Sequence, residues 1–221
     1  MPNSVFVIGD RSSLDAAIDG TAAVLRRGGL AIFPTDTVYV AASVARSGQS
    51  LSGGIERLFQ LKRRGRGPSF PWLVASAADL EVYGRDLTDE ALMLATCLWP
   101  SGLTLVVRAS SAVPRALARE DGTVALRCAD SPIASGLLHA CAAPLICTGA
   151  NPHGVATPVT YDEILSEVKA TVDTAIVDPN AACRGRSTIV DCTTRPVRLL
   201  REGCVPHAAV NEVLGYEMPF V

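Results

Sequence analysis

The chain has 221 residues, of which 48% are hydrophobic, and its formal net charge at pH 7 is −2. This length and apolar content suffice for a large domain with a buried core, and the near-zero net charge excludes a polycation that binds nucleic acid through its overall charge. No run of about 18 apolar residues occurs, which excludes a membrane-spanning helix.

The cysteines and the N-terminal residues indicate the cellular compartment. Seven cysteines are scattered along the chain, and no two of them form a Cys-x-x-Cys pair. Dispersed thiols in odd number favour reduced, mostly buried cysteines and argue against a metal site built from them. The first residues, MPNSVFVIGDRSS, lack the basic stretch and apolar core of a signal peptide. We therefore expect a cytoplasmic protein.

Apolar residues at helical spacing, with capping residues at their ends, predict a series of helices. Ser12 or Ser13 is expected to cap the first of them, and Pro132 stands at the start of another, where its missing N–H is tolerated. Thr160 and Glu163 have the spacing of a capping box. The predicted helices cover residues 12–29, 53–64, 87–100, 131–143 and 205–215, and a further helix is expected to open with residues 160–165.

Short apolar segments between the helices predict strands. These cover residues 30–43, 72–76, 103–109, 123–129, 144–151, 174–178, 187–193 and 196–202. Helices and strands intermix, and no repeat or low-complexity tract divides the chain. We therefore expect a single α/β domain over residues 1–221, built on a mixed parallel and antiparallel sheet.

The first predicted strand, LAIFPTDTVYVAAS, has an unusual polar centre. Thr35, Asp36 and Thr37 follow Pro34 inside this otherwise apolar run. A strand that only filled a core would not carry two hydroxyls and a carboxylate there. We therefore treat these residues as candidates for a binding site.

The densest positive charge lies at the predicted end of the second helix. Lys62, Arg63, Arg64 and Arg66 fall within five residues and are followed by glycine and proline. Two interpretations stay open. The run is either a solvated helix end, favoured by the helix dipole, or an anion site in which arginine and lysine bind a phosphate.

Two polar loops adjoin predicted strands. Thr148 and Asn151 lie where one predicted strand runs into a polar loop, at the position where ligands bind in open α/β sheets, and Ser187 lies at the start of another beside two arginines. Each loop is read either as an ordinary turn or as a cradle for an oxyanion or phosphate. Arg127 and Arg201 lie within predicted strands, where an arginine is either an edge residue or a ligand contact.

Several common nucleotide-binding and hydrolase signatures are absent from the sequence. It contains no phosphate-binding loop of the G-x-x-x-x-G-K-[ST] type, no G-x-G-x-x-G after a strand, no H-E-x-x-H and no G-x-S-x-G. A nucleotide would therefore be bound by dispersed basic and hydroxyl groups.

These segments, in this order, resemble the YrdC-type threonylcarbamoyl-adenylate (threonylcarbamoyl-AMP) synthases. GGLAIFPTDTVYVAA is similar to the family's Pro-Thr-(Asp/Glu)-Thr-Val-Tyr-Gly strand, and LFQLKRR is similar to its Lys-x-Arg segment. LWPSGLTLVV, VALRCADSPIASGLL and ICTGANPHGVATP resemble its next three motifs, while GRSTIVDCT and VRLLREGCV resemble its last two. The likeness runs from about Leu14 to Leu214, nearly the whole chain.

The resemblance implies an open, strongly twisted, mixed sheet with a basic concave groove. It implies an enzyme of the nucleotidyltransferase type that condenses L-threonine, bicarbonate or CO2, and ATP with Mg2+, and that releases pyrophosphate. The product, threonylcarbamoyl-AMP, then passes to a transferase that makes threonylcarbamoyladenosine (t6A) in tRNA.

The resemblance also assigns roles to individual residues. Lys62 and Arg64 are implied to be catalytic, because they would hold the phosphates and stabilise the leaving pyrophosphate. Thr35 and Thr37 would bind the amino acid or its carbamate, and Arg127 would pair with the substrate carboxylate. The nucleotide side would be lined, besides Lys62 and Arg64, by Thr148, Asn151, Ser187 and Arg201.

Four departures from the family pattern keep other functions open. Val40 stands where the family has glycine, Gly149 replaces a serine and thereby removes a hydroxyl, Ser101-Gly102 replaces Gly-Pro, and His153 stands near the family's loop serine. One alternative is a diverged paralogue that makes a related carbamoyl-type adenylate from another amine or from carbamoyl phosphate, as in HypF carbamoyltransferases. A second is a non-enzymatic module that binds RNA or nucleotide.

Overall fold

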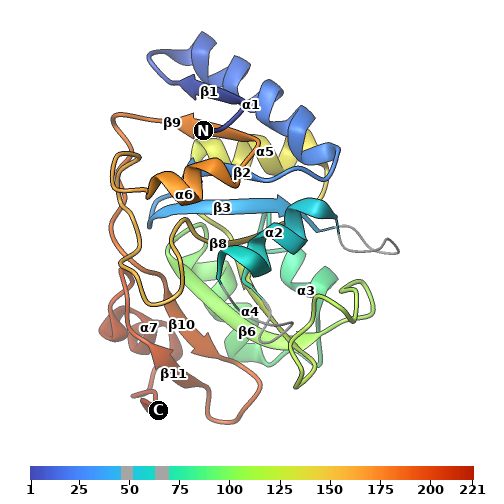
Figure 1. The fold of residues 1–221 in the computed structure, drawn as a ribbon. Helices are drawn as coiled ribbons and strands as arrows, with labels where there is room; N and C mark the ends of the chain where they lie inside the picture. Colours follow the sequence, from blue (N-terminus) through green and yellow to red (C-terminus); the bar gives the residue numbers. More distant parts are fainter. Residues whose placement is uncertain (46–51, 63–69) are drawn as a thin grey trace.

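The computed structural model describes residues 1–45, 52–62 and 70–221 (Figure 1). In this part of the chain eleven strands form one sheet. The strands are β1 Ser4–Val7, β2 Ala31–Pro34, β3 Tyr39–Val44, β4 Trp72–Leu73, β5 Gly84–Arg85, β6 Leu103–Ala109, β7 Thr123–Arg127, β8 Leu145–Gly149, β9 Thr174–Val177, β10 Thr188–Asp191 and β11 Arg198–Arg201. The helices are α1 Arg11–Arg26, α2 Gly53–Leu61, α3 Asp79–Tyr83, α4 Asp89–Leu98, α5 Pro132–Cys141, α6 Ser166–Ala170 and α7 His207–Leu214.

The strand order confirms the predicted mixed sheet. The order is β1-β9-β2-β3-β8-β4-β7-β6-β10-β11, with β5 paired to β6 beside this path. β9 runs parallel to β1 and β2, and β10 runs parallel to β6, whereas β3 is antiparallel to both β2 and β8. The last strands therefore return to neighbours that are far away in the sequence, which brings the C-terminal third beside the middle of the chain.

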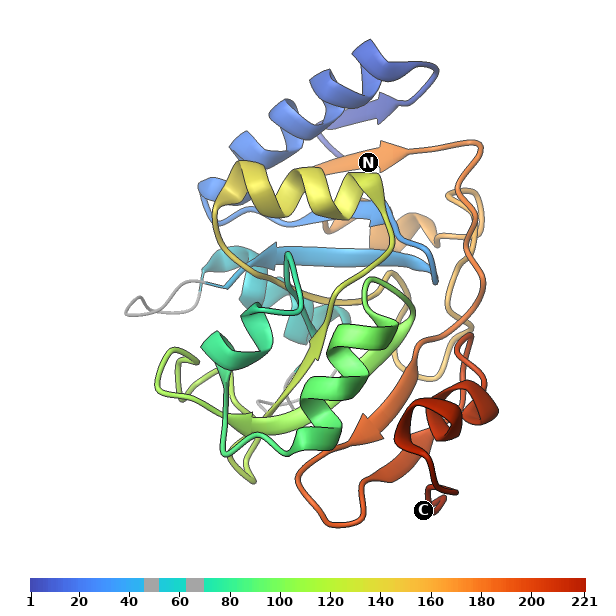
Figure 2. The same ribbon diagram turned by 180° about the vertical axis from the view of Figure 1, so that it is seen from behind.

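Helices cover both faces of the sheet around β3. Helices α1 and α5 pack side by side over one face, where a core cluster includes Leu25, Phe33 and Leu137 (Figure 2). Helix α2 lies on the other face, over the larger cluster that includes Tyr39 and Leu58. Because successive strand residues point to opposite faces and helices cover both of them, every residue of β3 is buried. No helix of the described segments is both long and apolar enough to cross a membrane.

The predicted strand at residues 30–43 is wrong in one respect, since it is a hairpin. β2 ends at Pro34 and β3 begins at Tyr39, and these two residues pair in antiparallel register. The backbone N–H of Thr35 donates to the carbonyl of Val38 at 3.1 Å and closes the turn. The hydrophobic pattern does not reveal the turn, because apolar residues flank it on both sides. The sequence of proline, threonine and aspartate does favour a turn.

Two predicted caps also differ from the structure. Asp10, not Ser12 or Ser13, caps α1: its Oδ1 accepts from the Ser13 N–H at 2.8 Å, and Ser13 Oγ accepts from the Asp10 N–H at 2.9 Å. No helix forms at 160–165; α6 begins only at Ser166. Glu163 nevertheless accepts from the Thr160 N–H at 3.3 Å, so the local capping contact forms without a helix to follow it. The short elements β1, α3 and β5 were not predicted.

Candidate functional site

The two threonines of the hairpin turn are buried and face each other. Thr35 and Thr37 are 3% and 0% exposed, and their hydroxyl oxygens lie 2.9 Å apart. Thr35 Oγ1 donates to the carbonyl of Val38 at 2.8 Å and accepts from the Thr37 and Val38 N–H groups at 3.2 Å each. The turn is therefore stabilised by its own hydroxyl groups, which hold it in one conformation.

Arg127 reaches this turn from the end of β7. Its guanidinium forms an ion pair with Asp36, donates from Nη1 to Thr37 Oγ1 at 2.6 Å, and donates from Nε to the carbonyl of Ser101 at 3.1 Å. The ion pair is largely removed from water, because the Arg127 and Asp36 side chains are only 7% and 12% exposed. A guanidinium has five N–H groups, so these bonds leave donors over for a further contact.

Lys62 and Asn151 form a second cluster. Lys62 follows α2 as its C-terminal cap and is 8% exposed. Its Nζ donates to the backbone carbonyl of Asn151 at 2.5 Å and to the side-chain Oδ1 at 2.8 Å. Asn151 Nδ2 in turn donates to the carbonyls of Pro152 at 3.1 Å and Val155 at 2.6 Å. One asparagine thus orients both the lysine and the loop after β8.

Ser187 and Arg201 form a third cluster. Arg201 donates from Nε to the Ser187 carbonyl at 2.9 Å and from Nη2 to Ser187 Oγ at 3.0 Å, and Thr104 Oγ1 donates to the same hydroxyl at 3.0 Å. Burial, followed by the nearby Arg186, lowers the pKa of Arg201 to about 10. Arg201 therefore remains a cation at neutral pH in a region where another cation already lies near.

All three clusters border the β2–β3 hairpin. The N–H groups of Arg184 and Gly185 donate to the carbonyls of Asp36 and Thr37 at 3.0 and 2.9 Å, which places the segment before Ser187 against the turn. The Ala150 N–H donates to the Tyr39 carbonyl at 2.9 Å, which places the Asn151 loop against the start of β3. The structure therefore gathers eight of the nine predicted site residues around one hairpin: Thr35, Thr37, Lys62, Arg127, Thr148, Asn151, Ser187 and Arg201.

The ninth predicted residue, Arg64, lies outside the described residues, as do Arg63 and Arg66. Thr148 is partly exposed near the end of β8, and His153 is exposed in the loop that follows. Within the described ranges no group of three or more histidine, cysteine, aspartate or glutamate side chains is placed to hold a metal ion. The predicted site residues that the structure describes carry hydroxyl, amide and cationic groups, and Asp36 adds the carboxylate that pairs with Arg127.

The structure also shows what surrounds the departures from the family pattern. Val40 is 4% exposed and packs into the core cluster on the α1 and α5 face. A Cβ atom added to Gly102 would overlap Sγ of Cys204 and lie 3.0 Å from Cγ2 of Thr37. A Cβ atom added to Gly149 would lie 2.6 Å from Cγ2 of Thr157.

Each of these two glycines thus faces a larger side chain from another segment. Cys204 fills the space beside Gly102, and Thr157 fills the space beside Gly149. Neither of these two contacts was predicted from the sequence. The sequence contained one indication of these contacts, since each glycine stands where the family has a larger residue.

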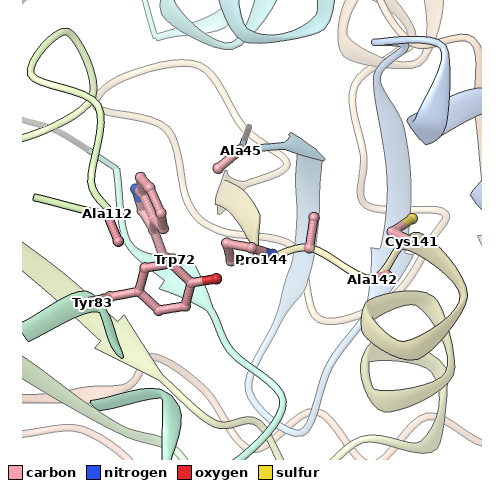
Figure 3. Close-up of a pocket in the computed structure, with 8 residues that line it drawn as sticks. Ala45, Trp72, Tyr83, Ala112, Cys141, Ala142 and Pro144 are labelled. Carbon is pink, nitrogen blue, oxygen red and sulfur yellow. The ribbon is translucent and has the colours of Figure 1, made fainter. Parts of the chain in front are cut away.

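One pocket lies beside the hairpin turn, and another lies at the far end of β3. Thr35 and Asp36 line a cavity of about 380 Å³ together with Ser131, Asp178 and Arg184. A separate pocket of about 360 Å³ lies at the opposite end of β3 and β8, where Trp72, Tyr83 and Pro144 line it (Figure 3). Burial raises the pKa of the Tyr83 hydroxyl. Only the first of these pockets touches a predicted site residue.

The chain is similar to known proteins over most of its length. A family model with the description "Telomere recombination", that of the Sua5, YciO and YrdC proteins, matches residues 23–203. The chain is 32% identical over 213 residues to a putative threonylcarbamoyl-AMP synthase of Mycobacterium leprae, covering 96% of this chain and 94% of that protein. It is 31% identical over 194 residues to the threonylcarbamoyl-AMP synthase of Pyrococcus abyssi, covering 88% of this chain and 56% of that protein.

A solved structure gives the same match in three dimensions. The crystal structure of P. abyssi Sua5 complexed with L-threonine superposes with a TM-score of 0.87 at 29% sequence identity. The match covers 100% of this chain and 62% of the Sua5 chain. The chain therefore spans little more than half the length of the Pyrococcus protein and nearly the full length of the mycobacterial one.

Proposed function

The chain belongs to the Sua5/YciO/YrdC family, and on that premise we propose that it is a threonylcarbamoyl-AMP synthase. It condenses L-threonine, bicarbonate or CO2, and ATP to L-threonylcarbamoyl-adenylate and releases pyrophosphate. The observation that carries this proposal is the match to a putative synthase along nearly the full length of both chains. The superposition on a Sua5 complex that contains L-threonine supports the same activity.

The proposed reaction needs charge neutralisation and positioning rather than a covalent nucleophile. The threonine amine adds to CO2 and loses a proton to form a carbamate. A carbamate oxygen then attacks the α-phosphorus of ATP, and the bond from this phosphorus to the bridging oxygen breaks as pyrophosphate leaves. Groups held rigidly around the reacting atoms accelerate such a step, because they stabilise developing charge without reorganising.

On the nucleotide side, Lys62 and Arg64 bind the phosphates and stabilise the leaving pyrophosphate in this proposal. The two bonds from Asn151 hold the Lys62 ammonium in place, and Thr148, Ser187 and Arg201 line the remainder of the nucleotide side. ATP enters as its Mg2+ complex.

On the amino-acid side, Thr35 and Thr37 contact L-threonine or its carbamate, and Arg127 binds the substrate carboxylate in this proposal. The bonds from Arg127 to Asp36, Thr37 and Ser101 fix the plane of its guanidinium. The remaining N–H donors of Arg127 therefore keep one orientation. We further propose that residues 1–221 act as one YrdC-like domain in the cytoplasm and that a tRNA-modifying transferase consumes the adenylate.

The test is a reconstituted reaction. Purified protein is incubated with ATP, Mg2+, bicarbonate and L-threonine, pyrophosphate release is followed, and the adenylate is identified by mass spectrometry. Lys62→Ala and Arg64→Ala are expected to lose threonine-dependent turnover. Arg11→Ala, which removes an exposed cation of α1, is the matched control and is expected to keep it.

Three results would contradict the proposal. Turnover with another amine or with carbamoyl phosphate, but not with L-threonine, would indicate the diverged paralogue. Salt-sensitive RNA binding without ATP turnover would indicate a binding module. Full activity of Lys62→Ala would remove the proposed role of the Lys62–Asn151 pair.

A further inference from the structure

Two adjoining pockets lie at the far end of β3, away from the hairpin turn. One is the pocket of Figure 3, of about 360 Å³, and the other has a volume of about 320 Å³. Tyr83, Ala142, Ala143 and Pro144 line both pockets, which therefore form one groove. We call it the Tyr83 groove. Each of its two parts falls within the size range of small-molecule sites, roughly 300–1,000 Å³.

Hydrogen-bond acceptors lie in the smaller pocket of this groove. Asp79 of α3 and His139 of α5 line it. Asp79 Oδ2 accepts from the N–H groups of Ala75 and Ser76 at 2.8 and 3.0 Å, and no described group donates to Oδ1. His139 Nδ1 lies 2.7 Å from the carbonyl oxygen of Ser135 and donates to it, so Nε2 of the neutral ring is an acceptor. A ligand of this pocket must therefore bring donors.

Tyr83 forms an aromatic wall beside the Asp79 carboxylate. Its ring packs against the buried Trp72, with the ring centroids 5.6 Å apart and the planes inclined by 58°. Figure 3 shows its hydroxyl oxygen pointing toward Pro144. Burial, and after it the charge of Asp79, raises the pKa of the Tyr83 hydroxyl. An aromatic ring close to a carboxylate attracts an organic cation, because the negative face of the ring and the negative charge act together.

We propose that the Tyr83 groove binds an aliphatic primary amine, whose ammonium group pairs with Asp79 in the smaller pocket while its carbon chain extends past Tyr83 into the larger one. The described residues that line the larger pocket carry no charged side chain, so this end suits a carbon chain better than a second charge. A free amine can fill both pockets, whereas a lysine of a partner protein enters only as far as its backbone allows. This inference does not depend on the proposed function.

The experiment is a titration of the full chain with hexylamine, followed by the amide shifts in ¹H–¹⁵N NMR spectra. 1-Hexanol has the same carbon chain without the charge and is the ligand control. Nα-acetyl-lysine N-methylamide carries the same amine on a unit of peptide backbone and distinguishes a free amine from a lysine side chain.

Four variants separate the charge from the ring. Asp79→Asn removes the charge and keeps an oxygen acceptor, Tyr83→Leu removes the ring, and Tyr83→Phe removes only the hydroxyl. Glu81→Gln is the matched control, because Glu81 is an exposed carboxylate of the same helix that lines neither pocket. The melting temperature and the amide spectrum of each variant show whether it is folded.

We expect hexylamine to shift the amides of Ala75, Ser76, Ala142 and Ala143 along saturating curves. Asp79→Asn should raise the Kd for hexylamine about tenfold or more, the effect of a hydrogen bond to a charged group. Tyr83→Leu should raise it about two- to fivefold, whereas Tyr83→Phe, which keeps the ring, should stay within about twofold. Glu81→Gln should leave the Kd unchanged. 1-Hexanol and the lysine derivative should bind more weakly than hexylamine.

Four outcomes would overturn the inference. Hexylamine could shift none of these amides, or it could bind no more tightly than 1-hexanol, which would leave an apolar groove without a preference for amines. Equal Kd values for Asp79→Asn and Glu81→Gln would show that Asp79 does not pair with the ammonium. Tighter binding of the lysine derivative than of hexylamine would assign the groove to a partner protein. If Asp79→Asn does not fold, the comparison of hexylamine with 1-hexanol on the unaltered chain still decides.

Discussion

Asp36 and Arg127, which are 91 positions apart, form an ion pair whose side chains are only 12% and 7% exposed. The same guanidinium bonds Thr37 and the carbonyl of Ser101. The pair therefore joins the hairpin turn to β7 and to the segment before β6, and it fixes the turn on which the proposed threonine site is built.

Removing one member of this pair should destabilise the fold. Asp36→Ala leaves the Arg127 charge buried without its partner, and we expect the free energy of unfolding to fall by about 3 kcal/mol in urea denaturation. Asp15→Ala breaks the exposed Arg11–Asp15 pair, whose side chains are 85% and 59% exposed, and serves as control. Its expected change is below about 0.5 kcal/mol. Equal losses in the two variants would show that burial of the Asp36–Arg127 pair does not matter.

Gly102 and Cys204 should be energetically coupled. In Gly102→Ala the new methyl group overlaps Sγ of Cys204, and we expect a loss of about 2 kcal/mol in the free energy of unfolding. Cys204→Ala removes the overlapping sulfur. Gly102→Ala should therefore cost less in the Cys204→Ala background than in the unaltered chain, and a double-mutant cycle measures this difference. Gly9→Ala, where a Cβ meets nothing within 4 Å, is the control. Additive losses would contradict the coupling.

Asp173 should contribute a pH-dependent part of the stability. Two hydrogen bonds from Arg57, at 3.0 and 2.5 Å, and one from the Leu30 N–H, at 2.8 Å, lower the pKa of this carboxyl in the folded state. The contribution is therefore present above the unfolded-state pKa of about 3.9 and is lost as the pH falls through the lower folded-state pKa.

Asp173→Asn tests this dependence. The loss in unfolding free energy relative to the unaltered chain should be full at neutral pH and should shrink as the pH falls below about 4. Urea denaturation at a series of pH values measures it, with Asp19→Asn on the exposed side of α1 as control. A loss that stays constant from neutral to acid pH would show that the ionised carboxylate is not the stabilising group.

The Tyr39 hydroxyl should ionise at a higher pH than that of an ordinary tyrosine. Burial raises the pKa of its hydroxyl to about 12. Because the folded-state pKa is raised, the stabilisation is present below the unfolded-state value of about 10 and is lost as the pH rises through the folded-state value. In an alkaline absorbance titration, the unaltered chain should therefore show one tyrosine ionisation that Tyr39→Phe lacks, and its midpoint should lie near pH 12. A difference centred near the ordinary tyrosine value would contradict this.

Local patterns predicted most of the regular elements. The strand expected at 103–109 is β6, Leu103–Ala109, because its apolar run has no competing turn signal. α5 begins at Pro132 as expected, with Ser131 as its N-cap. The helix expected from Thr160 begins only at Ser166, because Glu163 accepts from the N–H groups of Val159 and Thr160 and closes a turn there instead. The strand at 30–43 failed because hydrophobic periodicity cannot distinguish a hairpin of two buried strands from one long strand.

By itself the sequence determined which segments are apolar, which residues can hold charge or donate hydrogen bonds, and the family that their order resembles. Only the tertiary structure decided which of these groups meet: Lys62 with Asn151, Arg127 with Asp36, and Thr157 with Gly149. The first two pairs lie 89 and 91 positions apart, and their contacts depend on the strand order β2-β3-β8-β4-β7, which sets β3 beside β8 and brings β7 near the hairpin. Local spacing sets helices and turns, whereas pairing between distant strands follows from how the whole sheet buries its two faces.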